Sequence, residues 1–312
     1  MSVRGATIAR KTVRDFASPV LLAAFFVPFV GLTYVIGVIA VEPLPDDVAT
    51  LPLQAQEQWL IEAVSQVSFA WGAGVPVMVL VTVLAATGIA TEYERGTLRI
   101  LLSKPIRRRD VLLGKFAAIF LLTFLVMVAG LLLSASAVFY LSGASPGAIA
   151  GSIGHLLPGN LVYALVVSFV VASAGTFLAV TTGNRIRTVL GVLLIPALFF
   201  GFMVLRFAPT GDVYEGFRLY LVDVNYHFGN AFVFVHDAVG TEFNPATQSS
   251  LATTTGVFDA TESGVDPLVG GIAGSVPLVG HVPPVGSVGL LLVGSVGLLV
   301  GSVLYFERTD IA

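Results

Sequence analysis

The chain contains no cysteine, and only 11% of its 312 residues are charged. Without cysteine it can form no disulfide bond, no thiolate nucleophile and no zinc or iron-sulfur site built on sulfur. With so little charge it differs from a soluble domain, in which about a quarter of the residues are charged. Hydrophobic residues make up 56% of the sequence and the mean hydropathy is +0.92, values typical of a polytopic membrane protein.

The sequence also lacks the phosphate-binding loop of ATPases, in which a glycine and four further residues precede Gly-Lys-Ser or Gly-Lys-Thr. Its Gly114-Lys115 pair is followed by Phe116, and Arg109 stands where the first glycine would be. We therefore predict no nucleotide site, no cofactor site and no catalytic residue in this chain. The four histidines are scattered; His227 and His236 are the first candidates for a metal, but their spacing does not predict a metal site.

Six segments are long and apolar enough to cross a bilayer, which takes about 20 helical residues. They are Pro19 to Val41, Ser68 to Ala90, Phe116 to Leu141, Gly159 to Thr182, Thr188 to Ala208 and Val285 to Phe306. We predict an all-α integral membrane protein with six transmembrane helices, placed as a multi-pass protein in the cell membrane. Pro28, Pro76 and Pro196 lie inside spans, where each either kinks its helix or is tolerated by neighbouring helices.

The charges predict how the spans are oriented. Of the 16 Lys and Arg residues, 14 lie in the N-terminal segment, the connection between spans two and three, the turn between spans four and five, and the tail. Thirteen of the 19 acids lie in the two segments that would face the other side. Because positive charge is retained on the cytoplasmic side, we expect both termini to be cytoplasmic.

The spans themselves carry no ionisable group near their middle. Arg206 lies three residues from the end of the fifth span, close enough to extend its charge to the interface. Ion-coupled carriers need charged groups within the membrane, so this sequence disfavours such a carrier. The last span has a GxxxG at Gly297 to Gly301, which predicts close packing against another helix or a second copy of the chain.

The segment between the second and third spans, Thr91 to Lys115, is the most informative part of the sequence. Thr91 and Glu94 have the spacing of a capping box, which predicts that a helix starts afresh at Thr91. Pro105 should end it, and Asp110 should cap the next helix. Leucines at the spacing of one helical face predict a short amphipathic helix beside the membrane: Leu98, Leu101 and Leu102. A simpler interpretation is that the basic residues here only fix topology and contact anionic lipid.

A family resemblance rests on this segment, and the residues that carry it are Glu92, Glu94, Gly96-Thr97-Leu98, Leu101-Leu102, Pro105, Arg108, Asp110 and Leu112 to Lys115. They resemble the cytoplasmic signature of type-2 ATP-binding-cassette (ABC) exporter permeases, which reads E-x-E-x-G-T-L, two leucines, P-x-x-R, an acid and L-L-G-K. The layout of the whole chain is similar too, with a basic N-terminal helix, six spans and a long outer segment between the last two.

The resemblance implies a permease subunit of an ATP-driven exporter that forms the translocation pathway as a homodimer or a paired permease. A separate ABC ATPase subunit would bind ATP, and the chain would be a transporter component without an ATPase site. The lipid bilayer is the remaining expected partner, and no nucleic acid is expected. The segment 91–115 would contain the coupling helix, which docks in a groove of the ATPase.

The resemblance also assigns roles to residues. Glu92 and Glu94 would be partner-facing acids at the helix start, Gly96 the point of close approach, and Leu98, Leu101 and Leu102 the buried face, with Thr97 beside Gly96 in the same coupling loop. Pro105, Arg108 and Asp110 would shape the turn, with Gly114 and Lys115 at the entry to the third span. A non-transporting scaffold that acts through the same loop is the alternative function.

Four regions follow along the chain. We expect a cytoplasmic amphipathic helix in 1–18, spans one to five in 19–208 with the loop 91–115, an extracellular segment in 209–284, and the sixth span with a tail in 285–312. Within the extracellular segment, Arg218 to Val239 predicts an interfacial or partly re-entrant helix, and Asn244 to Gly256 predicts a loop.

Overall fold

The structure is a computed structural model, and it describes residues 3–16, 19–42, 48–72, 74–98, 106–207, 211–259 and 276–308. Within these ranges the chain is helical, and its only β pairing is the isolated antiparallel bridge between Phe258 and Leu278. Six helices are long and apolar enough to cross a membrane. The prediction of an all-α protein with six transmembrane helices is confirmed.

The membrane-spanning elements begin and end as follows. The first is α2 (Pro19–Val41), preceded by α1 (Val3–Phe16). The second is assembled from α3 (Leu53–Val67), the π-helix η2 (Ser68–Gly72), α4 (Val75–Ala85), the π-helix η3 (Ala86–Ala90) and α5 (Thr91–Glu94). The others are α7 (Arg108–Ser142), α8 (Pro146–Thr182), α9 (Arg185–Phe207) and α13 (Pro284–Arg308).

Three of these membrane-spanning elements are longer than the predicted spans by nine residues or more. The second element runs over 42 residues, α7 over 35 and α8 over 37. At 1.5 Å per residue they are roughly 50 to 60 Å long, whereas the hydrocarbon layer is about 30 Å thick. The apolar pattern located only the part inside the membrane, because the helices continue into polar sequence. Gly143 and Gly183 end α7 and α8 in the left-handed conformation that glycine adopts without strain.

The second span is interrupted close to the predicted proline. Pro76 lies in the first turn of α4, where a missing N–H costs nothing. Just before it, a Cβ on Gly74 would lie 2.2 Å from the carbonyl oxygen of Ala70, so only glycine fits there. Pro28 and Pro196 lie within α2 and α9, which continue past them.

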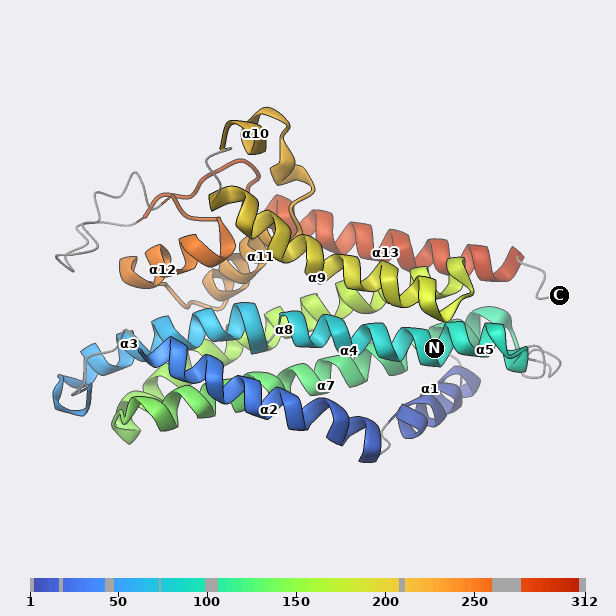
Figure 1. Cartoon of the computed structure of the whole chain (residues 1–312), viewed down its shortest axis with the longest axis horizontal. Helices are drawn as coiled ribbons and strands as arrows, with labels where there is room; N and C mark the ends of the chain where they lie inside the picture. Colours follow the sequence, from blue (N-terminus) through green and yellow to red (C-terminus); the bar gives the residue numbers. More distant parts are fainter. Residues whose placement is uncertain are drawn as a thin grey trace.

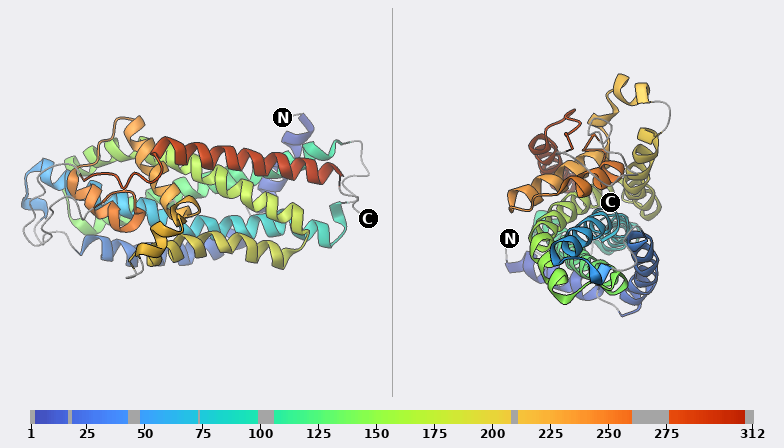
Figure 2. Two further views of the ribbon diagram at one scale, coloured as in Figure 1. Left: turned by 90° about the horizontal axis from the view of Figure 1, so that it is seen from above. Right: turned by 90° about the vertical axis from the view of Figure 1, so that its left-hand side faces the viewer.

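The helices form an elongated bundle (Figures 1 and 2), and the segments at its two ends differ in charge. Both termini lie toward the end that carries α1 and α5, which we call the basic end because the Lys- and Arg-rich segments are there. The opposite end, which we call the acidic end, carries α10 (Gly211–Gly216), α11 (Val224–Ala238) and α12 (Pro245–Thr255), with the 3-10 turns η1 (Val48–Thr50) and η4 (Leu219–Leu221).

The centre of the bundle is α8, which packs against α3, α4, α7, α9, α11 and α13. Four buried rings from different elements meet there, with neighbouring centroids 5.0 to 6.1 Å apart: Phe69, Tyr163, Phe199 and Phe232. In contrast, α2, α9 and α13 expose apolar side chains along one face, for example Val20, Ile186 and Val293. Such faces suit lipid or another transmembrane helix.

The elements of the acidic end share the core of the bundle. The predicted helix in Arg218 to Val239 is α11, which packs between α8, α9 and α13 and buries Phe228 and Phe232. The prediction of a loop for Asn244 to Gly256 is wrong, because α12 forms there. The Asn244 side chain caps α12 by accepting from the Thr247 N–H at 2.7 Å, and Gly256 ends it in the left-handed conformation. These two end signals and packing against α3 outweigh the low helix propensity of the Thr-rich sequence.

Arg206 does not extend its charge toward lipid headgroups. It donates to the Thr255 carbonyl at 2.6 Å and to the Asn225 amide oxygen, and its Nε lies 3.6 Å from the buried Asp223 carboxylate. Asp223 in turn accepts from the Tyr214 hydroxyl at 2.8 Å. The end of α9 is thereby joined to α10, α11 and α12.

Both candidate metal-binding histidines have partners within the chain. The ring of His227 lies 2.9 Å from Ser287 Oγ and 3.1 Å from the Leu221 carbonyl oxygen. His236 lies 2.8 Å from the Phe232 carbonyl, and burial lowers its pKa to about 4. Within the described ranges, no three His, Asp or Glu residues are grouped in a way that could hold a metal ion.

Candidate functional site at the basic end

Nine of the twelve predicted site residues lie in the described part of the chain, and Leu101, Leu102 and Pro105 lie outside it. The nine come from the end of the second span and the start of the third: Glu92, Glu94, Gly96, Thr97, Leu98, Arg108, Asp110, Gly114 and Lys115. The structure brings this segment against α1, α9 and α13, as the contacts described below show.

The helix does not start afresh at Thr91, so the predicted capping box is wrong. The backbone is helical at both Ala90 and Thr91, and α5 continues directly from the π-helix η3. The Ala86 carbonyl accepts from the backbone N–H of Thr91 in the π-helical turn, and the Thr91 hydroxyl donates to the same carbonyl at 2.9 Å. The two acids that follow therefore belong to the last turn of the second span.

Gly96 is where the chain turns away from the second span. Its φ of +67° is in the left-handed region, which favours glycine, and among the described residues no atom beyond its two chain neighbours lies within 4 Å of where its Cβ would be. Within the described part of the chain its role is therefore the backbone angle, and the close approach to an ATPase stays a prediction. Beyond it, Thr97 Oγ1 donates to the Glu92 carbonyl at 3.4 Å, and Leu98 is buried as predicted.

Glu92 joins the second span to the third. Its carboxylate lies 2.7 Å from Nζ of Lys115, which also donates to the Gly88 carbonyl at 2.7 Å. Lys115 is buried, whereas a third of the Glu92 side chain is exposed. A buried ammonium needs such partners, because an unpaired charge in a low-dielectric interior costs several kcal/mol.

Glu94 joins the second span to the fifth. Its Oε1 accepts from the backbone N–H of Arg185 at 2.8 Å, at the first residue of α9. The first N–H groups of a helix have no partner within it, and the helix dipole favours negative charge there. The predicted partner-facing acids thus have partners within the chain.

Arg108 and Tyr93 join the segment to the sixth span. Nη1 of Arg108 lies 3.5 Å from the carbonyl oxygen of Phe306, near the C-terminal end of α13, where a cation is favoured. The ring of Tyr93 packs edge-on against the Phe306 ring, with centroids 5.9 Å apart. No sequence pattern pointed to Phe306, because its contacts depend on how α13 packs.

The helix that contains the third span begins three residues earlier than predicted, at Arg108 and not at Val111. The residue at the helix boundary is Arg107, with an extended backbone, and Asp110 lies inside the first turn. Asp110 is therefore not the cap, although its charge suits the helix N-terminus.

Two glycines let α1 lie directly against the start of the third span and the end of the second. A Cβ on Gly114 would lie 2.7 Å from the Gly5 carbonyl oxygen and 3.1 Å from Cβ of Ile8. A Cβ on Gly88 would overlap the ring of Phe16, which is buried at the end of α1. The predicted N-terminal amphipathic helix exists, and it is packed on protein along this face.

A comparison with protein families decides the class of the chain. The model described as "ABC-2 family transporter protein" matches residues 5–216, which is about two thirds of the sequence. The chain belongs to the ABC-2 transporter family. It is therefore a multi-pass membrane protein and a permease component of a transporter, and permeases of the ABC-2 family normally pair with an ATPase subunit. No curated protein matches the chain.

The family match helps to locate the function of this ABC-2 permease. It begins within α1, contains the whole of the segment 91–115 and ends with α10. Most of the acidic-end elements and α13 lie beyond the matched range. The residues that carried the resemblance are therefore inside the part of the chain that the family shares.

Proposed function

We propose that this ABC-2 permease is the membrane subunit of an ATP-driven exporter, powered by a separate ATPase that docks on the segment 91–115. The observation that carries the proposal is that this segment is linked to three other helices of the bundle. Its ends contact α1 through Gly114, α9 through Glu94, and α13 through Arg108 and Tyr93, and Lys115 connects the second span with α7.

These contacts suggest how work done by the ATPase would reach the pathway. A partner can shift a conformational equilibrium only if it contacts the two states differently. A partner that displaces the segment would pull on the second and third spans directly. Through Glu94 it would also pull on the start of α9, and through Arg108 on the end of α13. Rigid-body rocking of helices about such a contact is a common form of switching.

The sidedness of the proposal rests on charge. The basic end carries 14 of the 16 Lys and Arg residues, and the ATPase would bind there in the cytoplasm, with both termini on that side. The acidic end would then face outward, and cargo would leave through it. In this proposal, residues 209–284 form the extracellular segment between the fifth and sixth spans.

We further propose that two copies, or this chain and a related permease, form the pathway. In addition to the apolar faces of α2 and α9, the chain offers Gly289, Gly294 and Gly297 on α13. Among the described residues, and apart from the backbone of α13 itself, no atom lies within 4 Å of the Cβ positions of these glycines. The serines of the same helix, Ser287, Ser295 and Ser302, are buried within the chain. The glycine face is thus free for the close helix approach that small residues permit.

Reconstitution tests the proposal. The permease and its cognate ATPase are placed together in vesicles, and ATP hydrolysis is measured with the purified pair and with each subunit alone. We expect the permease to change the ATPase rate and nucleotide to drive transport. Stable binding of the ATPase without any transport would favour the alternative, a membrane scaffold that acts through the same segment.

A further inference from the structure

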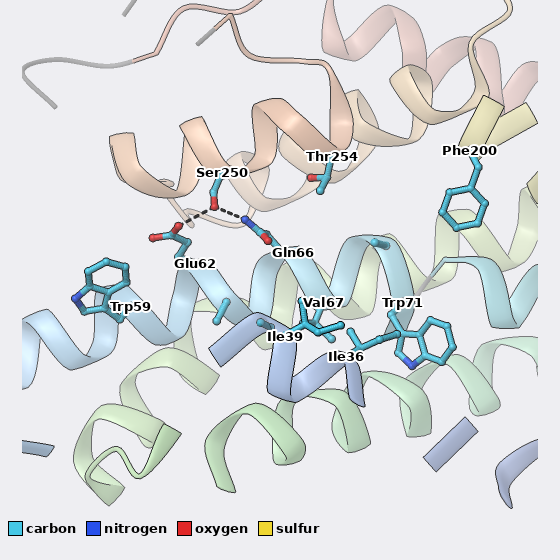
Figure 3. Close-up of a pocket in the computed structure, with 13 residues that line it drawn as sticks. Ile36, Ile39, Trp59, Glu62, Gln66, Val67, Trp71, Phe200, Ser250 and Thr254 are labelled. Atoms are coloured by element: carbon cyan, nitrogen blue, oxygen red, sulfur yellow. Dashed lines mark hydrogen bonds between the residues drawn. The ribbon is translucent and has the colours of Figure 1, made fainter. Parts of the chain in front are cut away.

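A cavity of about 390 Å³ lies where α2, α3, η2, α9 and α12 meet, and Figure 3 shows the side chains around it. Its polar and aromatic lining comes from Trp59, Glu62, Gln66, Trp71, Phe200 and Ser250. The volume falls within the range of about 300 to 1,000 Å³ that is usual for small-molecule sites.

The position of the cavity places it at a membrane boundary. Ile36 and Ile39, which line one wall, lie in the last two turns of α2, whose apolar helix ends at Val41. Phe200 lies within the membrane-spanning α9. At the other side, Ser250 belongs to α12 at the acidic end. A molecule in the cavity would therefore have an apolar part in the membrane and a polar part at its surface.

Among the described residues that line the cavity there is one acid, and none of them is a Lys, Arg or His. Glu62 Oε1 accepts from the Ser250 hydroxyl at 2.7 Å, and Gln66 Nε2 also donates to that hydroxyl oxygen. Within the described ranges, no Lys, Arg or His lies within ion-pair distance of Glu62. A carboxylate that is held in place and faces a largely apolar cavity favours a cationic ligand and disfavours an anionic one.

The aromatic lining favours the same charge. Trp59 and Trp71 are the two tryptophans of the chain, and both line this cavity. Trp71 is fixed in orientation, because its Nε1 donates to Thr33 Oγ1 at 2.7 Å and its ring stacks on Phe29 with centroids 5.6 Å apart. Tryptophan faces attract organic cations through the negative potential over the ring.

We propose that this cavity binds an amphipathic organic cation, whose charged group lies near Glu62 and whose apolar body lies between Trp71 and Phe200. The proposal names the substrate class of the permease and so rests on the proposed function. Neutral polar molecules such as sugars would use the hydrogen-bonding groups but would gain nothing from the charge of Glu62.

Two probes of nearly the same shape and opposite charge test the proposal: tetraphenylphosphonium and tetraphenylborate. Their binding is measured at equilibrium on the full-length permease, without ATPase, in nanodiscs of neutral lipid, with empty nanodiscs subtracted. We expect saturable binding of the phosphonium and much weaker binding of the borate. Glu62→Gln keeps an acceptor for Ser250 but removes the charge, and we expect it to weaken binding of the phosphonium about tenfold.

Glu57→Gln is the matched control, because Glu57 is on the same helix, lies beside His155 and is outside this cavity. It should bind the phosphonium as the unchanged chain does. Equal affinity for the two probes, or a Glu62→Gln variant with unchanged affinity, would overturn the proposal. Because no ATPase is present, loss of ATPase coupling would leave this result unaffected, so the two proposals fail separately.

Discussion

The Glu92–Lys115 pair allows the clearest test of how the basic end is held together. Replacing Lys115 by Met keeps the length of the side chain but removes the ammonium, which lies 2.7 Å from both the Glu92 carboxylate and the Gly88 carbonyl. Removing one partner of a fully buried ion pair costs about 3 to 5 kcal/mol. Because Glu92 is one-third exposed and can be hydrated, we expect a loss of about 2 to 3 kcal/mol for Lys115→Met.

The assay is reversible unfolding of the purified permease, in which that loss would lower the midpoint temperature by roughly 3 to 5 °C. A double-mutant cycle with Glu92→Gln isolates the pair itself. We expect the stability lost in the double variant to be about 1 to 2 kcal/mol smaller than the sum of the losses in the two single variants. Unchanged stability of Lys115→Met, or strictly additive effects, would refute the conclusion that this pair joins the second and third spans.

Two further predictions concern other parts of the bundle. Gly114→Val should separate α1 from the third span, since even a Cβ there would lie 2.7 Å from the Gly5 carbonyl oxygen. In this cysteine-free chain, a single cysteine in place of Ile8 should react faster with a maleimide in that variant, and an unchanged rate would contradict the packing. Burial lowers the pKa of His236 from 6.5 to about 4, so its neutral form stabilises the fold fully above pH 6.5 and progressively less down to pH 4. Relative to His236→Leu, the chain should lose about 3 kcal/mol of stability between pH 7.5 and pH 4, and a parallel pH dependence of the two proteins would argue against it.

The sequence predicted the membrane-spanning elements well, because apolar length is a local property. The bounds of α2 agree with the predicted first span at both ends. The predicted spans were too short where helices continue beyond the membrane, as α8 does from Pro146 to Gly159. Apolar length alone did not reveal this extension, because its sequence, PGAIAGSIGHLLPG, is rich in glycine and contains two prolines and a histidine, yet it still forms helix.

The partners of the site residues could not be predicted, because they depend on tertiary contacts. Glu92 and Glu94 were recognised from a local pattern, but their partners lie 23 and 91 residues further along the chain. The capping-box prediction at Thr91 failed for a related reason. A local motif describes a helix start correctly only if the preceding residues are not already helical, and here the π-helix η3 runs straight into α5.

The central claim is that an ATPase subunit binds the segment 91–115 and drives the permease through it. The most direct measurement is co-purification of the cognate ATPase with Glu94→Lys and Arg108→Glu permeases, alongside the unchanged chain. Arg218→Glu, at the acidic end, is the matched control. We expect the first two variants to reach the membrane in normal amounts but to retain much less ATPase, whereas the control retains it fully. Wild-type yields of ATPase with both basic-end variants would contradict the account.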